Sequence, residues 1–415
     1  MISAAKHSFQ LLVRAKAALI WLIAIPLLPM APLPVSAMGD RPAQQYATPG
    51  QTDLEGLLVK SLLEIRQNQL DLALRDIDTL LHTNPHFKLA QLIKGDLLLA
   101  RARPISTLGD VFGQDQQQAA ALREEARARL LRHLDRIPAN RVPKYLVQFQ
   151  PEQHYAVVVD TGKSTLYLYQ NDQGLPRYVT NYYITSGKAG AEKLKEGDQK
   201  TPIGVYFVTA SLPKSRLSDF YGDGAFPISY PNEWDKRQGK NGHGIWLHGV
   251  PSDTYSRPPR ASSGCVVLTN PDLEKLGKTL QIGLTPVIIS DQIEWVDPKE
   301  LQNERLALQQ QIDAWQRDWE SRDINRYLQH YSKSFAAPGQ NYSSWAQQKQ
   351  LVNSSKKWVK VKLSRLSMYR YPNDNLMVVT FDQDYSSNNL SQKTRKRQYW
   401  QLEGKQWKIA YEGTV

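Results

Sequence analysis

The stretches Trp246-Leu-His-Gly-Val250 and Ala261-Ser-Ser-Gly-Cys-Val-Val-Leu268 each place a reactive side chain beside a glycine. Cys265 is the only cysteine in the chain, which leaves three roles for it: a buried inert thiol, an intermolecular bridge or a nucleophile. A thiol attacks carbonyls as thiolate, and an imidazole within reach can accept its proton and lower the thiol pKa. His248 lies 17 residues earlier. The pattern favours Cys265 as nucleophile and His248 as base.

Two glycines beside these side chains are also expected to serve the chemistry. Gly264 has no Cβ, so it permits a tight turn whose N–H groups point at one spot, where they can stabilise an oxyanion. The carbonyl oxygen of Gly249 can hold the second ring nitrogen of His248, as a carboxylate does in other triads. Gly249 and Gly264 are therefore further candidate catalytic residues.

The hydrophobic pattern around this pair alternates as it does in strands. Residues 156–159 and 166–169 predict a hairpin, and further strands are predicted at 179–185, 205–210, 244–247 and 286–289. Glycine- and proline-rich loops separate these segments. A mostly β domain is expected over residues 145–297.

Three segments resemble the L,D-transpeptidase (YkuD-type) family and occur along the chain in the order that the family has. Counted from the C-terminal side, the first is the His-Gly pair followed, after a spacer, by Ser-Gly-Cys at 263–265. The second is Gly197-Asp-Gln-Lys-Thr-Pro-Ile-Gly-Val-Tyr-Phe207, which is similar to the family's Gly-Asp and Thr-Pro-x-Gly-x-Phe segment. The third is Asp160-Thr-Gly-Lys-Ser-Thr-Leu-Tyr-Leu-Tyr169, which resembles its opening hairpin. The resemblance covers residues 155–292.

The resemblance implies a specific reaction on bacterial cell-wall peptides. The cysteine attacks the carbonyl of a meso-diaminopimelate residue in a peptidoglycan tetrapeptide stem and expels the terminal D-alanine. A second stem's amine then resolves the acyl-enzyme and links the third residues of two stems, which is L,D-transpeptidation. If water resolves it, the enzyme is an L,D-carboxypeptidase that trims tetrapeptides to tripeptides. Neither route requires a metal or an organic cofactor.

Two positions depart from the family's motif. Ser263 stands where the motif has histidine, and Val267 stands where an arginine is common. The pattern Ser-Gly-Cys-Val-Val-Leu-Thr-Asn270 is closer to a divergent branch that includes cell-shape carboxypeptidases.

The segment between His248 and Cys265 is expected to form a lid that meets anionic stems. It carries four candidate contacts: Asp253, Tyr255, Arg257 and Arg260. Arg260 is the favoured substitute for the missing motif arginine, and loop solvation is the alternative for each residue. Ser263 and Trp246 complete the candidate substrate-binding set, with a core position as the alternative for Trp246.

The residues before the β domain predict export and a helical module. Residues 1–37 combine basic residues, an apolar run and Val-Ser-Ala, which is typical of a cleaved signal peptide, so the protein is expected in the periplasm or at the cell wall. Residues 38–51 are expected to be a linker. Apolar residues at helical spacing predict a helical module over 52–140 that begins with a tetratricopeptide-like hairpin. A homodimer through this module and a plain packing role both remain open.

The last segment, residues 300–415, predicts an α+β fold. A long amphipathic helix is followed by alternating strands, and the segment resembles SnoaL and nuclear-transport-factor-2-like (NTF2-like) cones. From residue 301 onward there are 18 Lys and Arg against 10 Asp and Glu. Outside the cell, such a basic domain favours an anionic wall polymer or lipid head groups over nucleic acid. Cones of this type often contain a cavity, which could bind a wall sugar. A solvated basic surface is the alternative.

The fold expected from the sequence is therefore a multidomain one, in which a helical module, a mostly β catalytic domain and an α+β cone follow one another. A non-catalytic wall-binding scaffold is the main alternative to an enzyme, because two motif residues are lost. Papain-like peptidases and sortases fit less well, since the former place cysteine before histidine and the latter separate the two more widely.

Overall fold

The computed structural model describes residues 53–109, 116–135, 137–138 and 140–415. The predicted signal peptide and linker lie outside these residues. The chain divides between Leu130 and Leu131 into two compact units. No helix in the described ranges is long and apolar enough to cross a membrane.

The first unit is helical, as the sequence predicts. Helices α1 (Leu54–Arg66) and α2 (Leu70–Thr83) pack against each other, and α3 (Lys88–Leu99) and α4 (Gln116–Leu134) follow. The side chain of Asp53 caps α1 by accepting a hydrogen bond from Gly56 N at 2.9 Å. The fully buried Arg129 is neutralised by Glu125, at 3.0 Å, and by Glu55.

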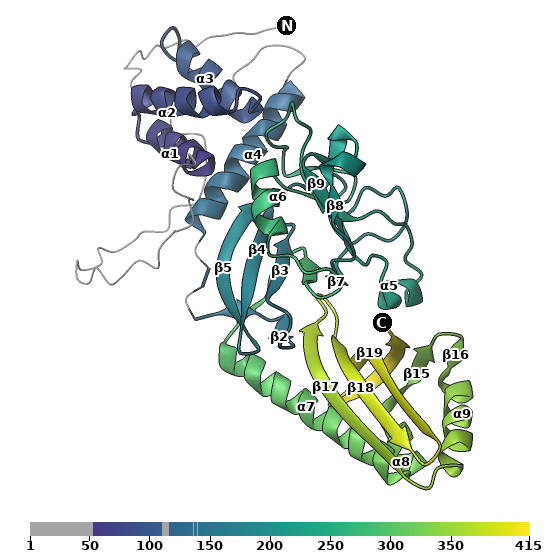
Figure 1. The fold of residues 1–415 in the computed structure, drawn as a ribbon. Coiled ribbons are helices and arrows are strands. Elements are labelled where there is room, and N and C mark those ends of the chain that lie inside the picture. Colours follow the sequence, from purple (N-terminus) through teal and green to yellow (C-terminus); the bar gives the residue numbers. More distant parts are fainter. Residues whose placement is uncertain (1–52, 110–115, 136, 139) are drawn as a thin grey trace, which may run out of the picture. The chain divides into compact units, whose positions relative to one another are not determined.

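The catalytic domain predicted from the motif consists mainly of two sheets with a core between them (Figure 1). One sheet has the order β5-β4-β3-β13-β7 and contains β3 (Tyr155–Asp160), β4 (Thr165–Asp172), β5 (Leu175–Tyr183), β7 (Gly204–Phe207) and β13 (Pro286–Ser290). The other has the order β12-β10-β9-β8 and contains β8 (Leu212–Pro213), β9 (Gly224–Pro227), β10 (Trp246–His248) and β12 (Val266–Val267). Val157 and Val159 of β3 pack with Leu247 of β10 in this core.

Two further pairs of short strands occur in the described residues. β6 (Ser186–Gly187) pairs with β11 (Arg260–Ser262), and β1 (Val142–Pro143) pairs with β14 (Trp295–Val296). The remaining short elements are η1 (Lys214–Arg216), η2 (Asp219–Tyr221), α5 (Glu233–Arg237) and α6 (Asn270–Gly277).

The C-terminal domain is the expected α+β fold. A seven-stranded sheet of order β16-β15-β20-β19-β18-β17-β2 packs with the helices α7 (Pro298–Ser321), α8 (Ile324–Gln329) and α9 (Tyr342–Ser354). Its strands are β15 (Tyr331–Ala337), β16 (Gln340–Asn341), β17 (Val359–Arg370), β18 (Leu376–Ser387), β19 (Leu390–Glu403) and β20 (Gln406–Thr414), with β2 (Leu146–Gln148) at the edge. Trp315 and Trp400 are fully buried in the core of this domain, whereas Trp358 is exposed.

The catalytic and C-terminal domains share structure that the sequence did not predict. β2 lies in the range expected for the catalytic domain, yet it pairs with β17 of the C-terminal sheet. The other face of β3, with Ala156 and Val158, packs in one cluster with Tyr369 of the C-terminal domain. Trp234 of α5 stacks on Tyr399 with ring centroids 5.7 Å apart. Because the domains share a core, we expect them to unfold together.

Candidate active site

The candidate nucleophile and base lie on neighbouring strands. β10 and β12 run parallel, with Leu247 opposite Val266 and His248 opposite Val267. Side chains alternate between the faces of a sheet, so Cys265, one residue before Val266, lies on the same face as His248. His248 is 1% exposed and Cys265 is partly exposed. The sheet thus brings the two predicted residues together.

The carbonyl oxygen of Gly249 fixes the imidazole of His248. The Nδ1 atom lies 2.7 Å from Gly249 O. A carbonyl oxygen only accepts hydrogen bonds, so Nδ1 must carry the proton and Nε2 has the free lone pair. Nε2 is therefore the atom that can accept a proton from a nucleophile.

Gly264 adopts a conformation that a larger residue would not tolerate. Its φ angle is +127°, and a Cβ at this position would lie 2.7 Å from the carbonyl oxygen of Lys200. Its N–H is donated to Ser262 Oγ at 3.1 Å, and Ser262 Oγ itself donates to Cys265 O at 2.6 Å. The N–H expected to face an oxyanion is thus engaged by Ser262, a buried residue that the sequence analysis did not single out.

The thiol and the imidazole are both neutral near pH 7. Burial raises the pKa of Cys265, against a backbone hydrogen bond from Trp246 and the charge of Arg257. Burial likewise lowers the pKa of His248 to about 4. The expectation of a lowered thiol pKa is therefore not met, because desolvation exceeds the opposing interactions. The thiol donates instead to Gly244 O at 3.3 Å.

An aromatic wall borders His248. The ring centroid of Tyr221 lies 5.1 Å from that of His248 and 4.8 Å from that of Trp246, and Phe220 lies 5.9 Å from His248. Phe220 is 52% exposed despite these contacts, so part of its ring is open to a ligand. Phe220 and Tyr221 lie in η2, and no motif in the sequence indicated them.

The predicted substrate-binding residues differ in their placement. Trp246 lies in the aromatic wall, while Arg260 is exposed at the start of β11 and Ser263 is exposed in the turn before Cys265. Arg257, from the same loop as Arg260, stacks on Phe220 with its guanidinium carbon 4.8 Å from the ring centroid. Of the two arginines, Arg257 is the one that contacts the aromatic wall.

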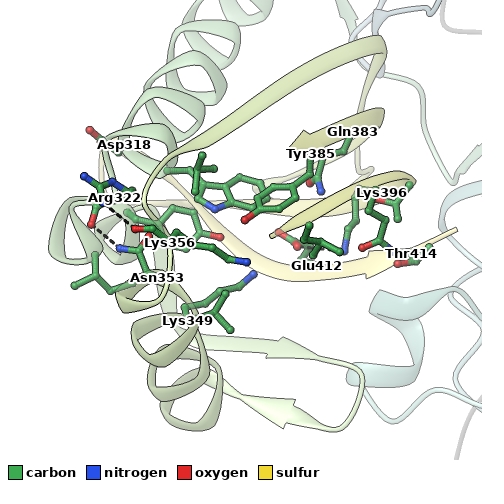
Figure 2. Close-up of a pocket in the computed structure, with 18 residues that line it drawn as sticks. Asp318, Arg322, Lys349, Asn353, Lys356, Gln383, Tyr385, Lys396, Glu412 and Thr414 are labelled. Carbon is green, nitrogen blue, oxygen red and sulfur yellow. Dashed lines mark hydrogen bonds and ion pairs between the residues drawn. The ribbon is translucent and has the colours of Figure 1, made fainter. Parts of the chain in front are cut away.

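A separate pocket of about 230 Å³ opens in the C-terminal domain (Figure 2). Its lining comes from α7, α8, α9 and the strands β17 to β20 and includes more cations than anions. Lys349 lies over the rings of Trp345 and Trp319, at 4.1 and 5.5 Å from their centroids, and burial lowers its pKa. Lys396 faces the buried Glu412 at 3.6 Å. The pocket therefore combines aromatic surface with an ammonium group that forms no ion pair within the described ranges.

Comparisons with known proteins support the family assignments expected for both domains. Residues 154–289 match the L,D-transpeptidase catalytic domain, and residues 307–413 match the Cds6 C-terminal NTF2-like domain. The structure of Bdellovibrio bacteriovorus Bd1075 is 31% identical over 66% of this chain and 98% of its own, with a TM-score of 0.59. The helical cell shape determining protein Pgp2 from Campylobacter jejuni is 27% identical over 65% of this chain and 95% of its own, with a TM-score of 0.56. A comparison with curated protein sequences found no match.

These likenesses extend over almost the full length of the similar structures and include both matched domains. The chain therefore belongs to the L,D-transpeptidase (YkuD) family of peptidoglycan-acting enzymes and carries an NTF2-like domain at its C-terminal side.

Proposed function

We propose that the chain cleaves the bond between meso-diaminopimelate and the terminal D-alanine of peptidoglycan tetrapeptide stems, through an acyl-enzyme on Cys265. The observation that carries the proposal is the 2.7 Å contact between His248 Nδ1 and Gly249 O. This contact leaves Nε2 free as a base on the strand beside Cys265. Membership of the YkuD family supplies the substrate class.

The first half of the reaction forms a thioester. The proton of the Cys265 thiol passes to Nε2 of His248 while the sulfur attacks the carbonyl carbon of diaminopimelate. The C–N bond to D-alanine then breaks, and the imidazolium gives its proton to the departing amine. In the second half, His248 accepts a proton from the incoming amine or water, and the Cys265 sulfur leaves and regains a proton.

The acceptor decides the product. As acceptor we propose the side-chain amine of a second stem, which makes the enzyme an L,D-transpeptidase. Water is the second candidate, which the partial exposure of Cys265 favours, and it gives an L,D-carboxypeptidase. Similarity to the helical cell shape determining protein Pgp2 suggests that either reaction serves cell shape. Because residues 1–37 predict export, we propose that the enzyme works in the periplasm.

For the C-terminal pocket we propose binding of an anionic fragment of the wall. Its support is the ammonium of Lys349, which is stacked on two tryptophans and has no ion pair among the described residues. An anionic sugar or peptide group can approach the ammonium while its apolar face covers the rings. Such binding holds the catalytic domain near the polymer that it modifies.

The deciding experiment is incubation of the protein with purified disaccharide-tetrapeptide, followed by mass spectrometry. Cross-linked dimers identify a transpeptidase, and tripeptide plus free D-alanine identifies a carboxypeptidase. Cys265→Ala must abolish either product. If the wild type gives no product but both proteins bind purified sacculi, the chain is a wall-binding scaffold instead.

A further inference from the structure

The loop that carries Arg257 is held in place at two points. Ser252 N lies 3.1 Å from the carboxylate of Asp219, and Ser252 Oγ donates to the same group. At the other end, the carbonyl oxygen of Arg257 accepts hydrogen bonds from Tyr183 OH at 2.9 Å and Thr185 Oγ1 at 3.0 Å. Tyr183 and Thr185 are both buried. The backbone of Arg257 is thus held in place by hydrogen bonds from two buried residues of the catalytic domain.

The side chain of Arg257 contacts an aromatic ring that borders His248. Its guanidinium stacks on Phe220, whose ring centroid lies 5.9 Å from that of His248. Burial raises the pKa of Cys265, and the positive charge of Arg257 opposes this rise. For His248, burial and the charge of Arg257 both lower the pKa. One positive charge, held over Phe220, thus acts on both groups.

This charge has no counter-ion in the described residues. Lys193, the other cation that affects the Cys265 thiol, forms a 2.7 Å ion pair with Asp198. Arg257 forms no ion pair or side-chain hydrogen bond within the described ranges, although burial lowers its pKa. A half-buried guanidinium is stabilised when a carboxylate completes its fork of donors.

The proposed substrate offers a carboxylate at the matching position. D-Alanine, the residue expelled from the tetrapeptide, ends in a free carboxylate one residue beyond the attacked carbonyl. We propose that Arg257 binds this terminal carboxylate, so that the enzyme selects the ends of stems over bonds inside a longer peptide. The inference rests on the proposed function and assigns to Arg257 the role that the sequence favoured for Arg260.

The test compares disaccharide-tetrapeptide with the same compound ending in D-alaninamide, which keeps the scissile bond but lacks the charge. We expect the wild type to prefer the carboxylate by about 10- to 100-fold in kcat/KM, the size of one charge-assisted contact. Arg257→Met should lose this preference, mostly through slower turnover of the carboxylate substrate. Arg257→Lys should keep part of it, because an ammonium retains the charge but not the fork.

Matched variants separate this role from others. Arg177→Met removes an exposed arginine of β5 and should leave the preference unchanged. If Arg260→Met, and not Arg257→Met, removes the preference, Arg260 is the anchor and the proposal is wrong. The proposal is also wrong if folded Arg257→Met and Arg257→Gln slow both substrates equally and slow alkylation of Cys265 by iodoacetamide, since Arg257 then acts only on the thiol.

The result for the wild type distinguishes a failure of the proposed function from a failure of the role of Arg257. A wild type that cleaves both substrates at equal rates, releasing D-alanine from one and D-alaninamide from the other, retains the proposed function and overturns the role of Arg257. A wild type that cleaves neither substrate overturns both the proposed function and the role of Arg257.

Discussion

The active site and the C-terminal pocket lie in the same compact unit but arise differently from the chain. His248 and Cys265 come from two adjacent strands and short turns, so one stretch of sequence contains most of the active site. The pocket lining runs from Asp318 to Thr414 and comes from three helices and four strands. Each site places on aromatic rings a cation that forms no ion pair with the residues described in the structure, Arg257 in one and Lys349 in the other. The residues of the proposed chemistry are thus close together in the sequence, while the proposed binding to the wall depends on the whole cone.

The largest effect that separates the two sites should come from His248→Ala. Without the base, kcat/KM for soluble tetrapeptide should fall by about 10²- to 10⁴-fold, while affinity for purified sacculi stays the same. His243→Ala, which removes an exposed histidine paired with Glu196, is the control and should match the wild type. Loss of sacculus binding in His248→Ala would show that the two sites are not independent.

Gly264→Ala should damage both activity and folding. The new Cβ would meet Lys200 O at 2.7 Å in a backbone conformation that favours glycine, so we expect a loss of about 2–4 kcal/mol in the free energy of unfolding. Gly283→Ala is the matched control, because φ is +75° there but a Cβ meets nothing within 4 Å. It should cost about 1 kcal/mol. Urea unfolding of both variants measures the difference, and equal losses would contradict the close approach at Gly264.

Lys349→Met should weaken binding without affecting catalysis. Loss of the ammonium over Trp345 is expected to reduce affinity for purified sacculi about 10-fold, a change of about 1.4 kcal/mol, in a pelleting assay. Turnover of soluble tetrapeptide should not change. Lys333→Met is the control, since Lys333 stacks on Tyr342 at the surface, outside the pocket. Equal binding by wild type and Lys349→Met would exclude the pocket from wall recognition.

The smallest effects should appear in the pH profiles. The active site should lose activity at the acid end of the pH range, and the pocket should lose affinity at the alkaline end. His248 must be neutral to act as base, and its pKa is lowered to about 4, so kcat/KM should stay level at neutral pH and fall only below about pH 4. Binding by Lys349 needs its charge, and its pKa is lowered, so sacculus affinity should fall at a lower pH than an ordinary lysine would give. An acid limb near pH 6 would mean that His248 is not desolvated in the free enzyme.

The part of the candidate active site that the sequence predicts is the part that depends on backbone geometry. Gly264 and Gly249 reveal a turn and a carbonyl contact because only certain residue types permit them. Phe220 and Tyr221 belong to the site only because the segment before β9 folds back over His248. Nothing in their own sequence distinguishes them from ordinary loop aromatics. The choice between Arg257 and Arg260 was equally hidden, since the two lie three residues apart in the sequence and only the fold places Arg257 in the loop over Phe220 and Arg260 in β11.

The sequence by itself determined the helical module, the β domain with its Cys265 and His248 motif, and the α+β cone, because periodicity and turn residues are local properties. The tertiary structure alone decided that both members of the pair are neutral, since desolvation depends on every group packed around them. It also decided that β2 joins the C-terminal sheet and that Lys349 meets Trp345 and Trp319, because pairing and packing join residues far apart in the chain. Local pattern predicts elements and motifs, whereas charge states and pockets belong to the assembled fold.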